Sequence, residues 1–244
     1  MLRKESVREP LWNLLKELQH STIFENYFLV GGTALSLQLG HRMSDDIDLF
    51  TKNDINKEEI FDFLNKNYNG QYQIINIQSL ILQVLVNEVK VDFVKYDYEL
   101  IENVKIDNGI KYLGKKDIAA MKLMAIANRG DQAKDFIDIY YLLKEISLTD
   151  MFNYYKKKYH QNDISPVKRS LVYFDDVTEN NWLAVKLIQD KLSVDKIKNR
   201  IIEEVNNHNK KETLTINQDI LNFSFWDKKE TATIYSKKAL FKIT

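Results

Sequence analysis

The chain of 244 residues has no cysteine. It therefore has no disulfide, no thiolate nucleophile and no cysteine-based zinc site, and a reducing cytoplasm is the compartment that we expect. No apolar run approaches the ~18 residues of a membrane span. Charged residues are scattered through the N-terminal segment, a pattern that argues against a signal peptide. With 44% hydrophobic residues, the sequence predicts a folded cytoplasmic protein that has a core and no membrane segment.

The sequence also lacks an excess of charge of either sign, because Lys+Arg and Asp+Glu are both 35. This balance indicates neither a nucleic-acid-binding tail nor a membrane-surface protein. Residues 1–110 nevertheless hold 11 basic and 17 acidic residues, which leaves 24 basic and 18 acidic residues for 111–244. A metal site in the first part and a polyanion contact in the second would give this split, as would two ordinary domains of different charge.

Glycine is scarce as well: the chain has 7, and two are adjacent at the start of GGTALSLQLGHRMSDDIDLF, residues 31–50. The preceding FLV predicts a short buried strand, and ALSLQL predicts a helix that ends at Gly40 in a left-handed cap. A strand that passes through Gly31 and Gly32 into a helix presents backbone N–H groups where phosphate binds well. Thr33 could cap that helix or hydrogen-bond a phosphate oxygen. Taken alone, Gly-Gly-Thr is more often a turn followed by a helix cap.

Two aspartates, Asp46 and Asp48, flank Ile47 in DIDLF, where acidic and apolar residues alternate as on a strand. Both carboxylates then lie on one face, and they repel each other unless a cation lies between them. Asp92 alternates with apolar neighbours in VKVDFVKY in the same way. Three acids on neighbouring strands can hold two Mg²⁺ ions, which stabilise the attacking and leaving oxygens in phosphoryl transfer. For Asp-x-Asp by itself, a solvated edge strand is the plainer interpretation.

Lys122 is the only polar side chain in IAAMKLMAIA, residues 118–127, so this helix is hydrophobic nearly all round and should be buried. Its ammonium group must either reach solvent or meet an anion such as a triphosphate. Asp135 and Asp138 are three residues apart in KDFIDIYYLLKE and share one helix face. Acids in a first turn are also ordinary partners of the helix dipole.

Three further basic side chains lie beside these motifs. Arg42 could form a salt bridge with the aspartates or contact a phosphate. Arg129, just before Gly130, could be a surface residue or a phosphate ligand. For His41 we expect capping or packing rather than catalysis.

Periodicity along the chain predicts an α+β fold, in which a small mixed sheet flanked by helices occupies residues 1–113 and a mostly helical domain occupies residues 114–244. A tight turn at Asn87-Glu88 predicts an antiparallel hairpin. The expected strands are 28–32, 46–50, 72–77, 80–86 and 89–96. The expected helices are 11–18, 34–40, 57–68, 115–128, 132–145, 149–160, 165–174 and 183–208.

Four separated motifs resemble, in their order, the nucleotidyltransferases of the AbiEii/AbiGii toxin family, which belong to the DNA polymerase β-like superfamily: GGTALSLQLGHRMSDDIDLF, VDF, KKDIAAMKLMAIANRG and KDFIDIYYL. The resemblance covers about residues 25–145. It implies a nucleotidyltransferase domain in residues 1–113, a helical domain after it and an NTP bound between them. Family members are toxins of toxin–antitoxin or abortive-infection systems, and some add nucleotides to the 3′ end of tRNA.

Position by position, the resemblance implies that Asp46 and Asp48 bind metal and that Asp92 is the third acid. It matches Gly32 and Thr33 to a phosphate-binding turn, Lys122 to a nucleotide-contacting lysine, and Asp135 and Asp138 to a KDxxD element. With the interpretations above, the expected catalytic residues are Asp46, Asp48, Asp92 and Lys122, of which the three aspartates are the metal ligands. The expected nucleotide-binding residues are Gly31, Gly32, Thr33, Arg42, Lys122, Arg129, Asp135 and Asp138.

The leading hypothesis is a nucleotidyltransferase that uses Mg²⁺, or Mn²⁺ in its place, to move an NMP from an NTP to an acceptor hydroxyl with release of pyrophosphate. Basic residues at 156–158, 168–169 and 210–211 could track tRNA or another RNA acceptor. A protein or a small molecule such as an antibiotic is the alternative acceptor. The rival from another class is a nucleotide- or protein-binding module that acts only in a complex with a cognate antitoxin.

Overall fold

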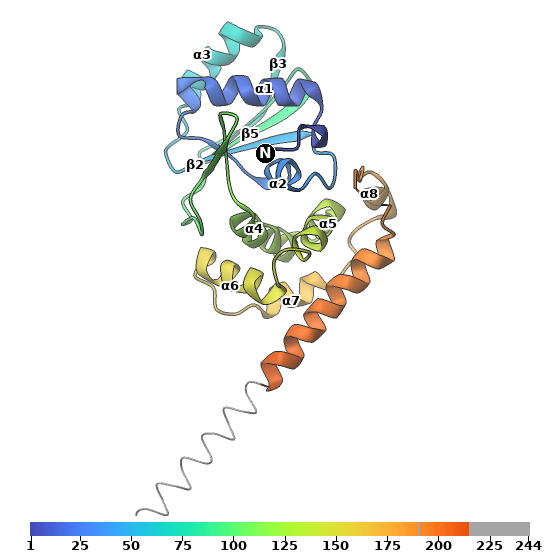
Figure 1. The fold of residues 1–244 in the computed structure, drawn as a ribbon. Helices are drawn as coiled ribbons and strands as arrows, with labels where there is room; N and C mark the ends of the chain where they lie inside the picture. The colour runs from blue at the N-terminus through green and yellow to red at the C-terminus, as the bar shows by residue number, and fades with distance from the viewer. Residues whose placement is uncertain (190, 215–244) are drawn as a thin grey trace, which may run out of the picture. The chain divides into compact units, whose positions relative to one another are not determined.

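Seven strands form one mixed sheet in the part of the chain that the computed structural model describes, residues 1–189 and 191–214. Their order across the sheet is β3-β4-β5-β2-β1-β7-β6 (Figure 1). The strands are β1 (Phe28–Leu29), β2 (Asp46–Thr51), β3 (Tyr72–Gln78), β4 (Ile81–Val86), β5 (Val89–Lys95), β6 (Lys105–Asp107) and β7 (Ile110–Tyr112). β2 pairs with β5 in parallel and with β1 antiparallel, which confirms the expected mixed sheet.

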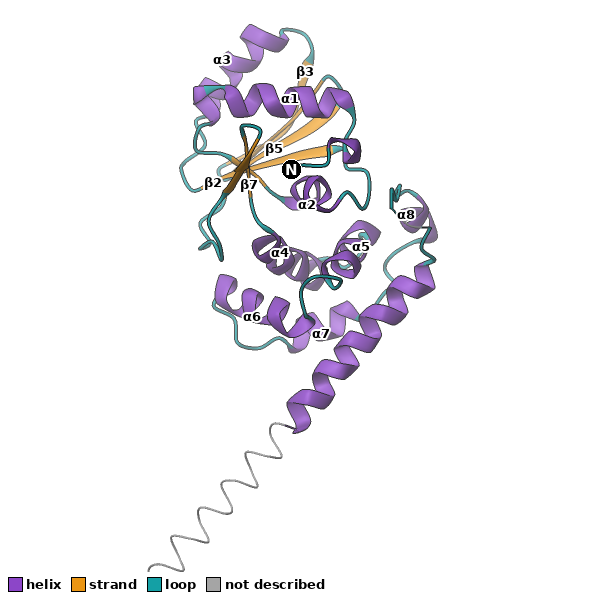
Figure 2. Cartoon of the chain, viewed as in Figure 1, coloured by secondary structure: helices purple, strands orange, loops and turns teal. Residues whose placement is uncertain are grey.

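The helices lie on both sides of this sheet (Figure 2). They are α1 (Glu9–His20), α2 (Gly31–Leu39), α3 (Lys57–Tyr68), α4 (Lys115–Asn128), α5 (Ala133–Leu142), α6 (Leu148–Tyr159), α7 (Ser165–Leu171) and α8 (Glu179–Leu183). Figure 1 shows α1 on one side and α2, with α4 and α5 beyond it, on the other. None of these helices, nor the helical residues 194–214, is long and apolar enough to cross a membrane.

Alternating burial gives the central strands one core face and one open face. Ile47 of β2, Val91 of β5 and Val84 of β4 are completely buried in the core, as are Leu11 and Leu15 of α1. The residues between them on each strand are only partly buried. The open face is therefore where polar side chains of three adjacent strands can meet a ligand.

The hairpin between β4 and β5 turns at Asn87 and Glu88, both with positive φ, as expected for a two-residue hairpin. This turn sets the register of the two strands, so that Gln83 is paired with Asp92. Gly40 ends α2 in the left-handed region with φ of 66°, which confirms the predicted cap.

The predicted helix at 183–208 is wrong in its first part, because residues 184–189 and 191–193 are not helical and the helix begins at 194. The backbone there pairs with a distant segment instead: Met43 N–H donates to the Lys186 carbonyl at 2.8 Å, and Ile188 N–H donates to the His41 carbonyl at 2.9 Å. These bonds satisfy backbone groups that a helix would otherwise pair locally. The three-residue strands β6 and β7 were not predicted from the sequence. The helix α7 ends at Leu171, before the predicted residue 174.

The chain divides after residue 202 into two units, and the second is described over residues 203–214. The first contains β1–β7 and α1–α8, and residues 203–214 of the second are helical. The predicted domain boundary at 113/114 falls between β7 and α4, inside the first unit, and stays a prediction. Residues 215–244 of the predicted helical domain lie outside the described residues.

Candidate active site

The open face of the sheet brings three carboxylates together. Asp48 of β2 and Asp92 of β5 are register partners in the parallel pair, and Asp46 precedes Asp48 by two residues on the same face. Ile47 between them is completely buried, so the strand is held with both acids outward. The alternation read from the sequence therefore placed these side chains on the correct face.

These carboxylates repel one another in the absence of a cation. Burial, followed by the nearby charges of Asp92 and Asp46, raises the pKa of Asp48 to about 6. The Oδ1 atom of Asp92 is buried and accepts no hydrogen bond from the residues that the structure describes. The unpartnered Oδ1 of Asp92 and the Asp48 carboxylate, which is costly to ionise here, are oxygen ligands that fit a hard divalent cation.

Within residues 1–189 and 191–214, no three acidic, histidine or cysteine side chains converge closely enough to hold one ion among them. A cation at this face would take carboxylate oxygens from β2 and β5. Phosphate oxygens and water would complete its shell, as is usual for Mg²⁺.

The glycine turn lies directly against the carboxylates. Gly31 has φ of +66°, and a Cβ atom added there would lie 2.3 Å from Oδ2 of Asp48. A Cβ atom on Gly32 would lie 2.3 Å from Nη2 of Arg42. Both glycines are thus required for close approach, and the start of α2 reaches the acidic site without a side chain in between.

Thr33 does not cap α2, which has no side-chain cap. Its buried hydroxyl instead donates to the backbone carbonyl of Asp46 and hydrogen-bonds the Ser44 hydroxyl at 2.8 Å. The predicted cap is wrong because a tertiary partner occupies the hydroxyl. These bonds tie the glycine turn to the beginning of β2.

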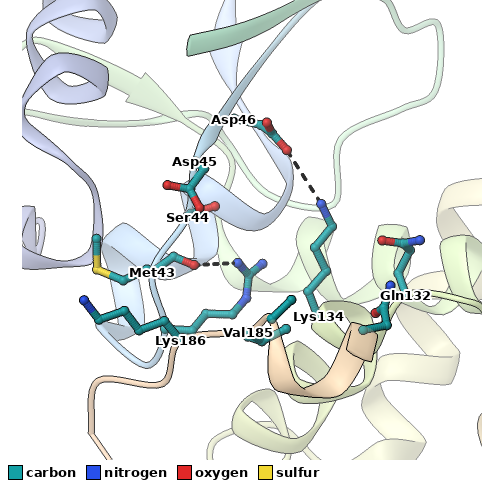
Figure 3. Close-up of a pocket in the computed structure, with 11 residues that line it drawn as sticks. Met43, Ser44, Asp45, Asp46, Gln132, Lys134, Val185 and Lys186 are labelled. Carbon is teal, nitrogen blue, oxygen red and sulfur yellow. Dashed lines mark hydrogen bonds and ion pairs between the residues drawn. The ribbon is translucent and has the colours of Figure 1, made fainter. Parts of the chain in front are cut away.

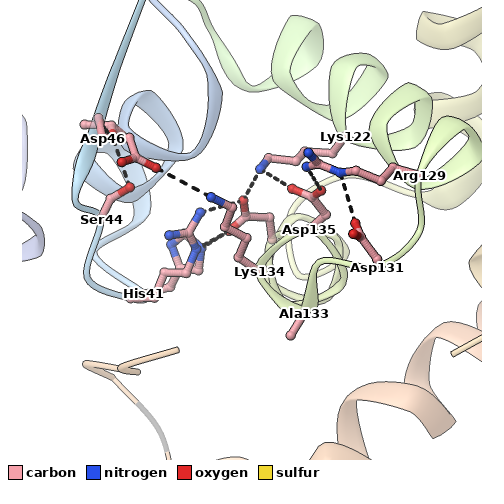
Figure 4. A network of polar contacts seen from close by, with 12 residues as sticks. His41, Ser44, Asp46, Lys122, Arg129, Asp131, Ala133, Lys134 and Asp135 are labelled. Carbon is pink, nitrogen blue, oxygen red and sulfur yellow. Dashed lines mark hydrogen bonds and ion pairs between the residues drawn. The ribbon is translucent and has the colours of Figure 1, made fainter. Parts of the chain in front are cut away.

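A buried charge network supports the site from the helical side (Figure 4). Asp138 accepts from Nε2 of His41 at 2.7 Å and from Nε and Nη2 of Arg42 at 2.7 and 2.9 Å. The Lys122 ammonium lies 2.6 Å from Asp138 and 2.7 Å from Asp135. Burial alone would raise the pKa of Asp138, but Arg42 and Lys122 hold it well below its ordinary value.

This network decides between the interpretations left open by the sequence. Lys122 is 6% exposed and meets carboxylates, so it does not extend into solvent. Arg42 forms its salt bridge with Asp138 of α5 and not with Asp46 or Asp48. His41 has the packing role that was expected, since it is completely buried against Asp138.

A cavity of about 240 Å³ lies between the carboxylates, the glycine turn and the two helices α4 and α5. Every expected site residue lines it except Asp138, which is completely buried behind Lys122. Arg129 lies at its margin, with 59% of the side chain exposed and a 3.0 Å ion pair to Asp131. The other lining residues are Ser44, Lys90, Ala125 and Lys134.

Three polar residues around the carboxylates were missed by the sequence reasoning. Lys134 lies 3.7 Å from Oδ2 of Asp46, and its position next to Asp135 in KDFID was a usable signal. Lys90 and Gln83 both donate to Oδ2 of Asp92 at 2.8 Å. The two-residue turn at 87–88 already places Gln83 opposite Asp92, so this neighbour could also have been derived from the sequence.

A second cavity of about 190 Å³ adjoins the first beyond the Lys134–Asp46 ion pair (Figure 3). The two share Arg42, Ser44, Asp46 and Lys134. The second extends along Gln132 and Asn181 to the non-helical segment 184–186. The incorrectly predicted helix is thus replaced by backbone that forms a wall beside the site.

One of the basic residues proposed to track RNA is not at the surface. Lys158 is completely buried, donates to Asp117 at 2.7 Å and to the Glu99 carbonyl at 3.0 Å, and lies 5.0 Å from the ring centre of Tyr96. It cannot contact a phosphate backbone, because its ammonium is held inside the protein. Its neighbour Lys157 is exposed, and Lys156 is partly exposed.

Comparisons with known proteins are consistent with this fold. An uncharacterized protein of Aquifex aeolicus (strain VF5) is 38% identical over 163 residues, which is 64% of this chain and 78% of that protein. A putative nucleotidyltransferase from H. pylori has a TM-score of 0.54 at 16% identity, covering 84% of this chain and 95% of its own. JHP933 from Helicobacter pylori has a TM-score of 0.55 at 16% identity, covering 89% and 100%.

A third solved structure is MenT4, a nucleotidyltransferase toxin from Mycobacterium tuberculosis H37Rv, with a TM-score of 0.51 at 13% identity and coverage of 83% and 84%. At these identities the solved structures establish the fold alone. The family model described as "Nucleotidyl transferase AbiEii toxin, Type IV TA system" matches residues 13–110, which contain the glycine turn and all three aspartates. Residues 13–110 of the chain therefore match the AbiEii family of nucleotidyltransferase toxins, and the chain is a nucleotidyltransferase.

Proposed function

We propose that the chain transfers an NMP from an NTP to a hydroxyl of an RNA acceptor, with tRNA as the expected target. The observation that carries this proposal is the convergence of Asp46, Asp48 and Asp92 beside a glycine turn, in one cavity with cationic side chains. The carboxylates suit Mg²⁺ or Mn²⁺, and the turn and the cations suit phosphate. Such an arrangement supports phosphoryl transfer through positioning and charge stabilisation.

In this proposal, Asp46, Asp48 and the unpartnered oxygen of Asp92 would hold the divalent cations. The bound cations would neutralise charge on the phosphates and on the leaving pyrophosphate. Asp92 accepts the proton of the acceptor hydroxyl as its oxygen attacks the α-phosphorus. The bond from the α-phosphorus to the bridging oxygen breaks, and pyrophosphate leaves.

The phosphates lie against Gly31, Gly32 and the side chains of Arg129 and Lys134. Lys134 is 40% exposed and is held only by its 3.7 Å pair with Asp46 among the contacts of the described residues. With a cation bound at Asp46, the Lys134 ammonium group would be available to contact a phosphate. The nucleoside part extends toward the adjoining cavity of about 190 Å³ along Gln132 and Asn181.

In this proposal Lys122 does not contact the nucleotide, as the resemblance implied that it would, and Arg42 does not contact a phosphate. Both are engaged with Asp135 and Asp138 of α5, whose two negative charges balance theirs, and they hold the helices in place. The family description names a type IV toxin–antitoxin system, which supports a cognate antitoxin as a partner of this chain.

The test is incubation of the protein with Mg²⁺, total cellular RNA and each α-labelled NTP in turn. The Asp46→Ala/Asp48→Ala double variant is compared with Asp54→Ala, which removes a carboxylate that is 94% exposed and outside the cavity. We expect label in a tRNA-sized band with the wild type and Asp54→Ala, and none with the double variant.

The other outcomes separate the parts of the proposal. Pyrophosphate release without labelled RNA would contradict the RNA acceptor and point to a protein or a small molecule. NTP binding without pyrophosphate release would contradict catalysis and favour a binding module. Equal activity in the double variant would remove the aspartates from the mechanism.

A further inference from the structure

A row of four polar side chains crosses the open face of the sheet from the proposed catalytic centre to the edge strand. Asp48 of β2 pairs in register with Asp92 of β5, Asp92 with Gln83 of β4, and Gln83 with Asn76 of β3. The next strand partners on the same face, such as Leu85 opposite Lys90, do not continue as a polar row. The row is therefore a local feature that begins at the carboxylates.

Hydrogen bonds fix which end of each side-chain amide in this row faces Asp92. An ionised carboxylate only accepts hydrogen bonds, so the amide nitrogen of Gln83 must face Asp92, to which it donates at 2.8 Å. The Gln83 carbonyl then points to β3 and accepts from Nδ2 of Asn76 at 3.2 Å. Asn76 thus fixes the orientation of the Gln83 amide, and Gln83 fixes one oxygen of Asp92.

These hydrogen bonds also determine the surroundings of the other Asp92 oxygen, Oδ1. With Oδ2 held by Gln83 and Lys90, Oδ1 is left buried and without a partner among the residues described. Because Asp48 is the register partner on the opposite side from Gln83, holding Oδ2 toward β4 leaves Oδ1 for the centre of the site.

We propose that Gln83 is a positioning residue that aims the Asp92 carboxylate at the divalent cation and the acceptor hydroxyl. This inference rests on the proposed function, since it requires that Asp92 acts there. Lys90 would hold Oδ2 less firmly with a cation bound at Oδ1, because that cation would repel its ammonium group. The neutral amide of Gln83 is not repelled and keeps its hydrogen bond, so it holds the carboxylate in both states.

A purely structural role does not account for Gln83. Its side chain lies on the partly exposed open face, whereas the core contacts of β4 come from Leu82 and Val84, both completely buried. Two other open-face residues of β4, Ile81 and Leu85, are apolar, so the strand does not need an amide for its own stability.

The experiment compares Gln83→Leu and Gln83→Glu with the wild type and with Gln73→Leu. Gln73 pairs with Leu85 in the neighbouring row, so Gln73→Leu makes the same chemical change without touching Asp92. The measurements are kcat and KM for NTP, thermal unfolding, and Mn²⁺ binding by electron paramagnetic resonance in the absence of nucleotide. The last readout is independent of turnover.

For Gln83→Leu we expect kcat and Mn²⁺ affinity to fall by about ten-fold or more, the usual effect of losing a partner that orients a ligand. KM for NTP should stay within about two-fold, because no residue of β3 or β4 lines the cavity beside the glycine turn. Gln83→Glu should be worse than Gln83→Leu, since it places a carboxylate against Asp92. Gln73→Leu should match the wild type.

Wild-type kcat and Mn²⁺ affinity in Gln83→Leu would overturn the proposal. So would a lowered melting temperature with unchanged Mn²⁺ affinity, which would indicate a structural role only. An Asp92→Asn variant separates this failure from failure of the proposed function: if Asp92→Asn also retains full activity, the assignment of Asp92 is wrong, and Gln83 has nothing to position.

Discussion

Asp48 should destabilise the folded protein at neutral pH, and replacing it with asparagine should relieve this cost. Burial and the charges of Asp92 and Asp46 raise its pKa from 3.8 to about 6. A difference of about two pKa units corresponds to about 3 kcal/mol at ~1.36 kcal/mol per unit, an upper limit for this single group. The Asp48→Asn variant has no such group to ionise, so its free energy of unfolding at pH 7 should exceed that of the wild type by up to about 3 kcal/mol.

The sign follows from the protons bound. Between the unfolded pKa near 4 and the folded pKa near 6, the folded state binds more protons than the unfolded state, so wild-type stability falls as the pH rises through this window. At pH 4 the carboxyl group is protonated in the folded state, and the two proteins should be about equally stable. Above about pH 6 the full difference should be present.

Urea denaturation from pH 4 to pH 7 in EDTA measures this difference, with Asp54→Asn as a control at an exposed acid. Mg²⁺ should narrow the gap at pH 7 by stabilising only the wild type. The Asp48→Asn protein should be more stable and yet inactive, because the repulsion belongs to the proposed cation site. If the free energies of unfolding of the two proteins changed in parallel with pH, folding would not raise the pKa of Asp48, and the prediction would be refuted.

Three further predictions concern the groups around the site. Asp138→Asn should lower the free energy of unfolding by about 3–5 kcal/mol in urea denaturation, because buried cations lose their shared carboxylate; a loss below ~1 kcal/mol would contradict the network. Gly31→Ala should lower the transfer rate by about ten-fold or more by displacing Asp48. Gly70→Ala should retain the rate, because Gly70 also has positive φ but a Cβ atom there would meet no described residue within 4 Å. In the same denaturation assay, Lys158→Met should lower the free energy of unfolding by about 3 kcal/mol, because it leaves Asp117 buried without its partner. The exposed Lys157→Met should lower it by less than about 0.5 kcal/mol, and equal effects of the two variants would argue against a buried ion pair.

Local patterns in the sequence predicted the elements that carry the site. The alternation in DIDLF and VKVDFVKY set which side chains face outward, because the period of a strand is two residues. The helix α3 and the helix α4 have the predicted bounds, since their periodic apolar residues end at clear polar breaks. The short strands β6 and β7 gave no such signal, because three residues are too few to show a period.

The partners of the charged residues were decided by tertiary structure. Arg42 lies four residues from Asp46 in sequence, yet its salt bridge is with Asp138, 96 residues away, because α5 packs against the segment that follows α2. Lys158 belongs to a basic run that suggests a solvated face, but the fold buries it against Asp117. A charge pattern states which groups need a counter-charge, and only the packing of helices against the sheet selects the group that provides it.

The sequence by itself determined the three carboxylates, the glycine turn and the face on which they lie, because strand alternation and backbone sterics act over a few residues. Tertiary structure decided which cations line the cavity, which are consumed in the buried network around Asp138, and how the segment at 184–186 comes to wall the adjoining cavity. Those outcomes depend on burial and on contacts between residues far apart in the chain, and a local sequence pattern predicts neither.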